Sequence, residues 1–266
     1  MKKFMSKRGF LARKINKIAV SLHKGYENLN YVFEKNGEFS VIKKIKNSTF
    51  KVESIFDVGA NHGEWSTMVN NIFPEAKIHS FEVLPSTYKH LIEACKGIKN
   101  IQCHEFGLSD SDQILEATIS SASDGLTTLV PDFTEEFHSA PVSHTTVQTK
   151  NGGSFCDTKN IEQIDLLKID VEGYENKVLL GLEGMIKQGK VKIIQFEYGF
   201  INVKTHFLLY DFYEFFKQHN MRVGKIYPSY VDFGDYVYQD ENFYGPNYLA
   251  VHESEVDLIA SLSKKL

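Results

Sequence analysis

Short apolar runs and longer segments with helical spacing follow one another along most of the chain. The runs are about the length of buried strands, and the segments between them carry apolar residues every three or four positions, as helices do. The runs predicted to be strands are residues 54–57, 77–82, 101–105, 166–169, 192–197, 221–226 and 248–251. Residues 113–120 alternate loosely and are predicted to form an extra strand. The predicted helices cover residues 65–72, 85–95, 206–219 and 255–265, and a further helix starts near Glu175.

The first 50 residues are expected to be an extension and cover for a main domain at residues 51–266. Residues 25–50 are predicted to be a hairpin or loop, because apolar residues lie on both sides of Asn36-Gly37. Residues 1–24 hold eight lysines and arginines and no acid. Helical spacing places four apolar residues of this segment on one face. They are Leu11, Ile15, Ile18 and Leu22.

Two interpretations of this basic helix remain open. It packs its apolar face onto the domain, or it lies peripherally on an anionic membrane surface. Lys14 and Lys17 interrupt any signal-peptide core, so we expect a cytoplasmic protein, either free or at the inner membrane surface.

Composition and charge narrow the class of protein. The chain has 266 residues, of which 42% are hydrophobic, so one good-sized domain is expected. A net charge of −4 gives no reason to expect a nucleic-acid partner. Cys95, Cys103 and Cys156 are scattered without zinc-site spacing and are expected to be reduced thiols. No apolar run approaches the ~20 residues that cross a bilayer.

The most informative stretch is Asp57-Val58-Gly59-Ala60-Asn61-His62-Gly63, where an apolar run passes through alternating glycines into a helix. Glycine lets a ligand approach the main chain, and the start of a helix offers free N–H groups. The spacing is neither the dinucleotide fingerprint nor a P-loop. Asp57 would repel a diphosphate but favours a ligand with ammonium and hydroxyl groups. S-adenosylmethionine (SAM) has both and carries no phosphate, so it is the expected cofactor.

Glu82 ends the next predicted strand, about twenty residues past the glycine turn. In sites built as strand, turn, helix and strand, an acid at this position accepts hydrogen bonds from a ribose diol. Glu82 is therefore expected to bind the ribose of the cofactor.

Residues 165–175 form the second informative stretch. Lys168 interrupts a buried-type strand, and a buried lysine needs a partner, so an acid from a neighbouring strand should meet it. Asp170 and Glu172 follow at the carboxyl end of this strand, and Glu197 ends the next one. If the strands are parallel, the acids at four strand ends converge on the edge where α/β sheets bind ligands. These acids are Asp57, Glu82, Asp170 and Glu197.

Two further segments suggest features of the site. Residues 121–145 are rich in Ser, Thr and Pro and are expected to form a functional lid. Residues 227–244 combine aromatic residues with acids, a composition that suits sugar binding and equally suits an aromatic hairpin core.

These motifs resemble the FkbM family of SAM-dependent methyltransferases over roughly residues 50–252. The resemblance implies a Rossmann-like class I methyltransferase fold, an α/β fold with a seven-stranded, mostly parallel sheet and helices on both faces. It implies SAM over the glycine turn, with Asp170 also near the cofactor. The other implied cofactor residues are Asp57, Gly59, Ala60, Asn61, Gly63, Glu82, Val83 and the adenine border at Gly107, Leu108 and Ser109.

The expected reaction is methylation of a hydroxyl group on a sugar, a glycan or a small metabolite. Such a hydroxyl is a poor nucleophile, so a nearby base helps. Asp170 is the first candidate base and Glu197 the second, while Glu172 and His62 are weaker candidates.

Three alternatives stay open. The acceptor atom could be nitrogen or carbon, which often needs no strong base. The chain could instead be a non-catalytic SAM-binding scaffold in a glycan-assembly complex. No metal is expected, although Asp170 and Glu172 could together hold Mg²⁺.

Overall fold

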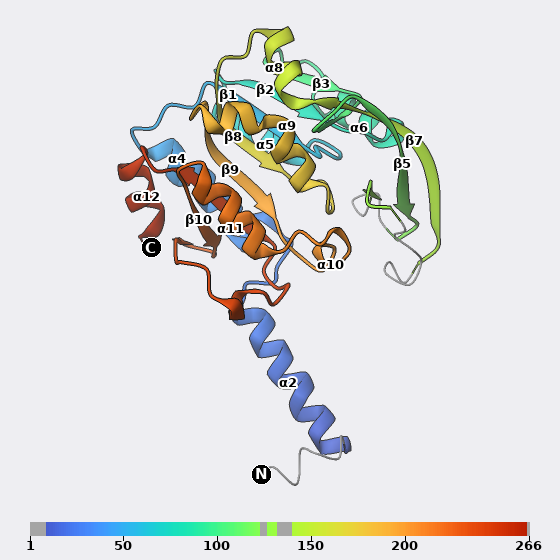
Figure 1. The fold of residues 1–266 in the computed structure, drawn as a ribbon, viewed down its shortest axis with the longest axis vertical. Coiled ribbons are helices and arrows are strands. Elements are labelled where there is room, and N and C mark those ends of the chain that lie inside the picture. The colour runs from blue at the N-terminus through green and yellow to red at the C-terminus, as the bar shows by residue number, and fades with distance from the viewer. Residues whose placement is uncertain (1–8, 123–126, 132–139, 265–266) are drawn as a thin grey trace.

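The computed structural model describes residues 9–122, 127–131 and 140–264. Its centre is an eight-stranded sheet with the strand order β11-β10-β12-β9-β8-β1-β2-β3 (Figure 1). The strands are β1 (Ser54–Val58), β2 (Lys77–Phe81), β3 (Ile101–His104), β8 (Ile164–Ile169), β9 (Val191–Glu197), β10 (Met221–Ile226), β11 (Val231–Asp232) and β12 (Asn247–His252). β11 and β12 run antiparallel to their neighbours, and the other six strands run in one direction.

The sheet confirms the predicted α/β class, with one correction to the strand number. Seven strands were expected, and the sheet has eight. The additional strand, β11, has two residues and pairs only with β10 at the edge of the sheet. An element of this length leaves no apolar run in the sequence by which it could be recognised.

Helices cover both faces of this sheet, as expected. On one face, α8 (Gly152–Lys159), α9 (Glu175–Lys187) and α11 (Leu209–Gln218) contribute to a core that includes Phe155 and Phe212. On the other face lie α4 (Glu38–Asn47), α5 (Glu64–Ile72), α6 (Pro85–Ala94) and α12 (Val256–Ser263). Ile55 and Phe56 of β1 belong to opposite cores because successive strand residues point to opposite faces. The short helices α10 (Asn202–Thr205) and η2 (Tyr238–Asp240) lie in the connections.

A second sheet of four strands stands beside the first, in the order β4-β7-β5-β6. Its strands are β4 (Gly107–Ser109), β5 (Gln113–Ser120), β6 (Thr127–Thr128) and β7 (Val142–Asn151). β5 confirms the predicted extra strand, and residues 107–109, the implied adenine border, form the short strand β4. Residues 123–126 and 132–139 of the expected lid lie outside the described residues.

The predicted hairpin at residues 25–50 is wrong, because this segment forms α3 (Phe33–Asn36) and α4. Gly37 has a φ of 108° and joins these two helices, so the Asn-Gly pair turns the chain between helices and not between strands. Val41, Ile42 and Ile45 of α4 are fully buried in the core shared with α5 and α12.

The basic segment does form the predicted helix, α2 (Phe10–Tyr26), which projects from the body of the protein (Figure 1). No residue of α2 is buried, so its apolar face does not pack onto the domain. Among the described residues, none of the helices combines the length and apolar character needed to cross a bilayer.

Candidate active site

A cavity of about 940 Å³ lies at the carboxyl ends of β1, β2, β8 and β9. This is the edge at which open parallel sheets bind ligands. Most of the predicted site residues line it: Gly59, Ala60, Asn61, His62, Glu82, Val83, Gly107, Leu108, Asp170, Glu172 and Glu197. Asp57, Gly63 and Ser109 are not part of its lining. Ser109 is buried and its hydroxyl donates to Asp110.

The turn after β1 depends on Gly59. Its φ is 87°, and its N–H donates to the carbonyl oxygen of Phe81 at 3.0 Å. A Cβ atom at this position would lie 1.8 Å from the carbonyl oxygen of Asp170. Only glycine therefore lets the loops after β1 and β8 lie this close together. Gly63, with a φ of 85°, precedes α5 and packs against Leu91 behind the cavity.

Glu82 is held by the backbone of the two loops around it. Its Oε2 accepts the N–H of Asn61 at 3.0 Å, and its Oε1 accepts the N–H of Leu84 at 2.8 Å. Burial raises the pKa of Glu82, and these backbone hydrogen bonds oppose that rise. Each carboxylate oxygen retains a lone pair for a further donor. The side chain is thus fixed and still able to accept hydrogen bonds from a ligand.

Two buried polar atoms of residues that line the cavity have no hydrogen-bond partner in the part of the chain that the structure describes. The Oδ1 atom of Asn61 and the Nε1 atom of Trp65 are buried and make no hydrogen bond with the described residues. Both residues line the cavity. Buried polar groups are normally hydrogen-bonded, so these atoms suit a ligand that has both donors and acceptors.

Lys168 lines the cavity, although only 7% of its surface is exposed. Its Nζ atom is 2.8 Å from Oδ2 of Asp170 and 4.0 Å from Oδ1 of Asp57. Burial alone would lower its pKa, but the surrounding carboxylates outweigh burial and raise it. Asp57 lies on the neighbouring strand, in register with Lys168, which confirms the prediction that a neighbouring acid meets this lysine.

Asp57 itself is completely buried. Its Oδ2 atom accepts a hydrogen bond of 2.6 Å from the hydroxyl of Ser66 on α5. Burial raises the pKa of Asp57, against the opposing effect of Lys168. The residue connects Lys168 to the helix that follows the glycine turn.

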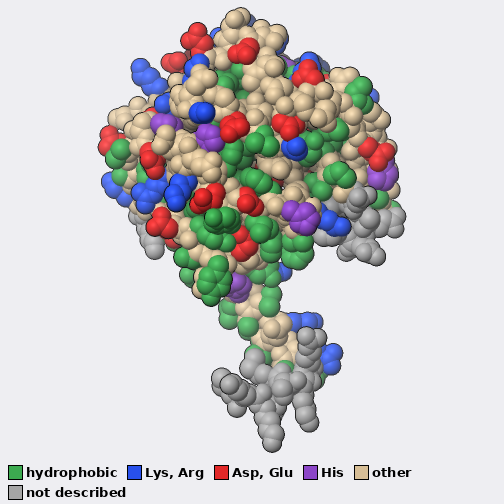
Figure 2. Space-filling view, in the orientation of Figure 1, with side chains coloured by type: hydrophobic (Ala, Val, Ile, Leu, Met, Phe, Trp, Pro, Cys, Tyr) green, Lys and Arg blue, Asp and Glu red, His purple; other side chains and the backbone are tan. Residues whose placement is uncertain are grey.

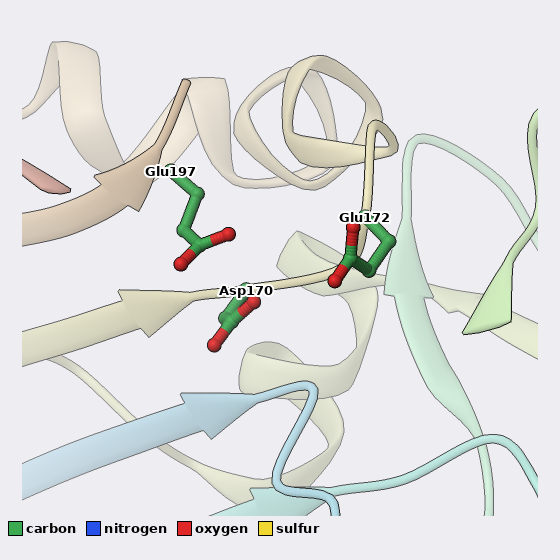
Figure 3. A group of neighbouring side chains, drawn as sticks. All are labelled: Asp170, Glu172 and Glu197. Carbon is green, nitrogen blue, oxygen red and sulfur yellow. The ribbon is translucent and has the colours of Figure 1, made fainter. Parts of the chain in front are cut away.

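Three carboxyl groups face one another across the cavity, and we call Asp170, Glu172 and Glu197 the acid cluster (Figure 3). Oxygen atoms of the three residues lie within 4.8 Å of one another. Asp170 and Glu172 follow β8, and Glu197 is the last residue of β9. Among the described residues, the carboxyl oxygens of Glu172 and Glu197 accept no hydrogen bond, whereas Asp170 is paired with Lys168.

Burial and neighbouring carboxylates favour the protonated forms of Glu172 and Glu197. Burial and the charges of Asp170 and Glu175 raise the pKa of Glu172 to about 8. Burial, Asp170 and Glu172 raise the pKa of Glu197 well above its usual value. Such a cluster can release and accept a proton near neutral pH, which is the property of an effective general base.

The backbone at Glu172 is in an unusual conformation that its neighbours stabilise. Glu172 has a φ of 52°, which is uncommon for a residue with a side chain. Its carbonyl oxygen accepts a hydrogen bond of 2.6 Å from the hydroxyl of Thr128 on β6. Oε1 of Glu175 accepts the N–H groups of Val171 at 3.2 Å and Gly173 at 3.1 Å. Backbone strain of this kind is common at functional sites.

Sequence reasoning missed the contribution of the N-terminal segment. Glu38 of α4 lines the cavity, although it lies before the predicted domain. Its carboxylate accepts hydrogen bonds from the side chains of Asn36, Gln195 and Asn247. Tyr31 and Phe33 also line the cavity. No spacing signal connects these residues to the strand ends, because only the tertiary fold brings them together.

His62, a weaker candidate base, lies on the rim of the cavity and is exposed. Its ring lies edge-on against the ring of His90 at 4.7 Å. His62 extends from the glycine turn and is not a member of the acid cluster.

The acid cluster is also the group of residues that could hold a metal ion. Carboxylate oxygens are the ligands that Mg²⁺ prefers. However, the ammonium of Lys168 already neutralises one carboxylate, and raised pKa values of the glutamates favour neutralisation by protons. Clustered acids alone do not establish a metal site.

Comparison with known proteins identifies the family. The methyltransferase FkbM domain matches residues 57–223, which is more than half of the chain. The chain belongs to the FkbM methyltransferase family. The matched range starts at Asp57 and includes the glycine turn, Glu82 and the acid cluster, so the family assignment and the cavity concern the same residues.

Curated relatives of this FkbM-family chain include two fungal proteins. Methyltransferase sdnD of Sordaria araneosa is 33% identical over 158 residues, which cover 48% of this chain and 60% of that protein. Methyltransferase 1 of Beauveria bassiana (strain ARSEF 2860) is 28% identical over 144 residues, covering 48% of this chain and 58% of that protein. The match thus spans less than two thirds of either relative.

Solved structures resemble the chain more distantly. The methyltransferase FkbM from Methylobacillus flagellatus KT has a TM-score of 0.48 and 13% identity, covering 75% of this chain and 43% of that one. Fibrillarin from Aeropyrum pernix, with natively bound S-adenosyl-L-methionine, has a TM-score of 0.36 and 12% identity, covering 78% and 71%. The α/β class rests on the strand order of the sheet itself.

Proposed function

We propose that this chain is a SAM-dependent methyltransferase that methylates a hydroxyl group on a sugar, a glycan or a small metabolite. The observation that carries the proposal is the acid cluster, which lies in the same cavity as a glycine-lined turn and a fixed, buried Glu82. A cavity of about 940 Å³ is within the range of small-molecule sites.

The residues around the glycine turn fit the chemical groups of SAM. Gly59 leaves space where a side chain would clash, and Glu82 can accept hydrogen bonds from a diol. Asn61 and Trp65 supply a buried acceptor and a buried donor, neither of which has a hydrogen-bond partner among the described residues. Val83, Gly107 and Leu108 would border the adenine. When bound, SAM supplies a methyl group on a positively charged sulfur, which carries the reactive chemistry.

The three acids of the cluster have two different roles in this proposal, orientation of the acceptor and acceptance of its proton. Asp170 is fixed by the ammonium of Lys168 at 2.8 Å, so we assign it to orienting the acceptor hydroxyl. Glu172 and Glu197 have raised pKa values and no hydrogen bonds to the described residues, so we assign proton acceptance to this pair. General-base assistance of this kind is typically worth about 10²–10⁴-fold in rate.

The acceptor is expected to be uncharged or cationic near its reacting atom. Asp170, Glu172 and Glu197 would repel a phosphate at this point, which argues against a nucleic-acid backbone as substrate. Tyr31, Phe33 and Phe200 line the same cavity and offer aromatic side chains to a sugar ring or another small molecule.

The alternatives make different predictions about the acid cluster. Methylation of nitrogen or carbon would leave activity largely intact when Glu172 and Glu197 are neutralised. A non-catalytic scaffold would bind SAM and transfer no methyl group. The raised pKa values of both glutamates favour hydroxyl methylation over these alternatives.

The test is calorimetric titration of the purified protein with SAM and S-adenosylhomocysteine, comparing wild type with Glu82→Gln. Glu105→Gln is the matched control, because Glu105 is exposed beyond the neighbouring strand. Binding by wild type and the control, and weaker binding by Glu82→Gln, would support the cofactor site. A folded wild type that binds neither compound would refute the proposal. If wild type binds SAM, transfer of radiolabelled methyl groups to nucleotide sugars and glycans would identify the acceptor class.

A further inference from the structure

The helix α2 presents an apolar stripe that nothing in the described chain covers. Five large side chains project from one side of the helix and are between 50% and 74% exposed. They are Leu11, Ile15, Ile18, Leu22 and Tyr26. Their spacing of three and four residues places them along one face. A stripe of this length is unusual on a surface that faces only water.

The opposite face of α2 is cationic. Arg13, Lys17 and Lys24 lie on it and Lys14 lies on its flank, and the first acidic residue of the chain is Glu27, after the helix ends. Figure 2 shows lysine and arginine side chains on this projecting helix. Four more lysines and arginines precede the helix in the sequence, at positions 2, 3, 7 and 8. The segment therefore combines an apolar face with a strong and unbalanced positive charge.

The carboxyl end of α2 is firmly attached to the domain, although the rest stands clear of it. Glu27 forms an ion pair with the buried Lys225, whose Nζ atom also donates to the carbonyl oxygen of Tyr244 at 3.0 Å. The side chain of Asn28 donates to the carbonyl oxygen of Ile226 at 2.9 Å. The helix is thus held in a defined direction away from the body (Figure 1).

We propose that α2 binds the surface of a membrane that contains anionic phospholipid. The helix would lie along the interface, with its apolar stripe in the acyl region and its lysines and arginines among the anionic head groups. Each cation near such a surface strengthens binding by roughly fivefold. No helix of the described residues can span the bilayer, so the contact is peripheral.

The charge pattern favours lipid over a second copy of the chain. Two α2 helices paired through their stripes would cover the apolar residues but turn their cationic faces outward. Neither helix has an acidic residue to neutralise those cations, so such a pair leaves the positive charge uncompensated. An anionic membrane offers acyl chains to the apolar stripe and negative head groups to the lysines and arginines at the same time.

Membrane binding would also determine where the cavity lies. Tyr31 and Phe33 follow α2 within a few residues and line the cavity. A chain bound through α2 would hold its cavity close to the lipid surface. This inference concerns location and stands whether or not the proposed methyl transfer is correct.

The test is co-flotation of the full chain with vesicles of phosphatidylcholine, with and without phosphatidylglycerol. Wild type is expected to float only with the anionic vesicles and to be released by high salt. The double variant Ile18→Gln/Leu22→Gln should lose binding by about tenfold or more, because the glutamines cannot enter the acyl region. The matched control Asn16→Gln/Ser21→Gln places the same residues on the other side of α2 and should bind like wild type.

Three results would overturn the inference. One is the absence of flotation by wild type with anionic vesicles at low salt. Another is equal binding by the stripe variant and its control. The third is a concentration-dependent dimer in analytical ultracentrifugation that only the stripe variant disrupts, which would assign the stripe to a second copy. Circular dichroism and thermal unfolding of the same variants check that they remain folded.

Discussion

Gly59 and Asp170 meet backbone to backbone, at a separation that leaves no space for a side chain at Gly59. The missing Cβ atom would lie 1.8 Å from the carbonyl oxygen of Asp170. The turn proposed to hold the cofactor and the loop that carries Asp170 and Glu172 are therefore positioned by the same contact. A change at either residue should affect both parts of the site.

Replacing Gly59 with alanine should destabilise the protein and abolish SAM binding. Gly97→Ala is the matched control, because Gly97 has a similar φ of 83° but open space around its Cβ position. The control should cost about 1–2 kcal/mol from backbone strain alone, and Gly59→Ala should cost more, because the loops must also separate. Urea unfolding and calorimetric titration measure both effects. Equal losses in the two variants would show that the contact with Asp170 has no importance.

Neutralising Asp170 should affect catalysis far more than cofactor affinity. Asp170→Asn removes the partner of Lys168 at 2.8 Å and the group that orients the acceptor. We expect a rate lower by about 10²-fold, the usual cost of misplacing a reacting group, with the dissociation constant of SAM nearly unchanged. Single-turnover transfer and titration of the same sample separate these quantities. If SAM binding is lost instead, Asp170 is a cofactor residue.

The rate of transfer should rise with pH through the titration of the acid cluster. The pKa of Glu172 is raised to about 8, so the base form is scarce below that value and increases above it. Glu172→Gln removes a charge that raises the pKa of Glu197, so the remaining profile should shift toward lower pH. A pH profile of kcat/KM for both proteins is the measurement, and identical profiles would exclude the pair as the base.

The folding stability of the protein should decrease with rising pH, whereas the rate of methyl transfer should increase. In the unfolded chain Glu172 titrates at its usual value of 4.5, and in the folded chain at about 8. Between these values the folded state binds more protons, so stability decreases as the pH rises through this window. The melting temperature of the cofactor-free protein should therefore fall between pH 5 and 8, within the same window, and Glu172→Gln should reduce that slope. A slope unchanged by the substitution would contradict the assignment.

Thr128 should act as a positioning residue for Glu172. Thr128→Val removes the 2.6 Å hydrogen bond to the carbonyl oxygen of Glu172 but keeps the shape of the side chain. Thr118→Val is the matched control, because Thr118 pairs with Thr128 across the strands and its hydroxyl is near His144 instead. We expect Thr128→Val to lower kcat several-fold and to shift its pH profile, at a stability cost of about 1 kcal/mol. A loss of stability alone would indicate a purely structural role.

Removing divalent metals should leave methyl transfer unchanged. Lys168 and protons already offset the charge of the acid cluster. Activity measured with excess EDTA, and again after adding Mg²⁺, tests this expectation. Activity that EDTA removes and Mg²⁺ restores would instead assign Asp170, Glu172 and Glu197 to a metal.

The sequence predicted those parts of the site that local patterns encode. β1, β2, β8 and β9 are short, mostly apolar segments, and Asp57, Glu82, Asp170 and Glu197 lie within one residue of their carboxyl ends. The need of Lys168 for an acid followed from the energy of burying a charge. Parallel strands in one sheet then bring these residues to a single edge without further information.

The remaining parts of the site depend on contacts that no local pattern encodes. The helices α3 and α4 are short, and the glycine between them resembles a hairpin turn. Glu38 reaches the cavity only because α4 packs against the sheet, where Gln195 and Asn247 donate to it. Thr128 contacts Glu172 across 44 positions of the chain. Such contacts arise when the fold is complete.

The role of Glu38 means that the region matched by the family is shorter than the region that must fold together. The region shared with the family begins at residue 57, yet α4, before it, contributes Val41, Ile42 and Ile45 to the core. A chain cut at the start of the shared region would lose one wall of its cavity and a layer of its interior. Exchange of such regions between relatives would therefore succeed only when the preceding helices are exchanged with them.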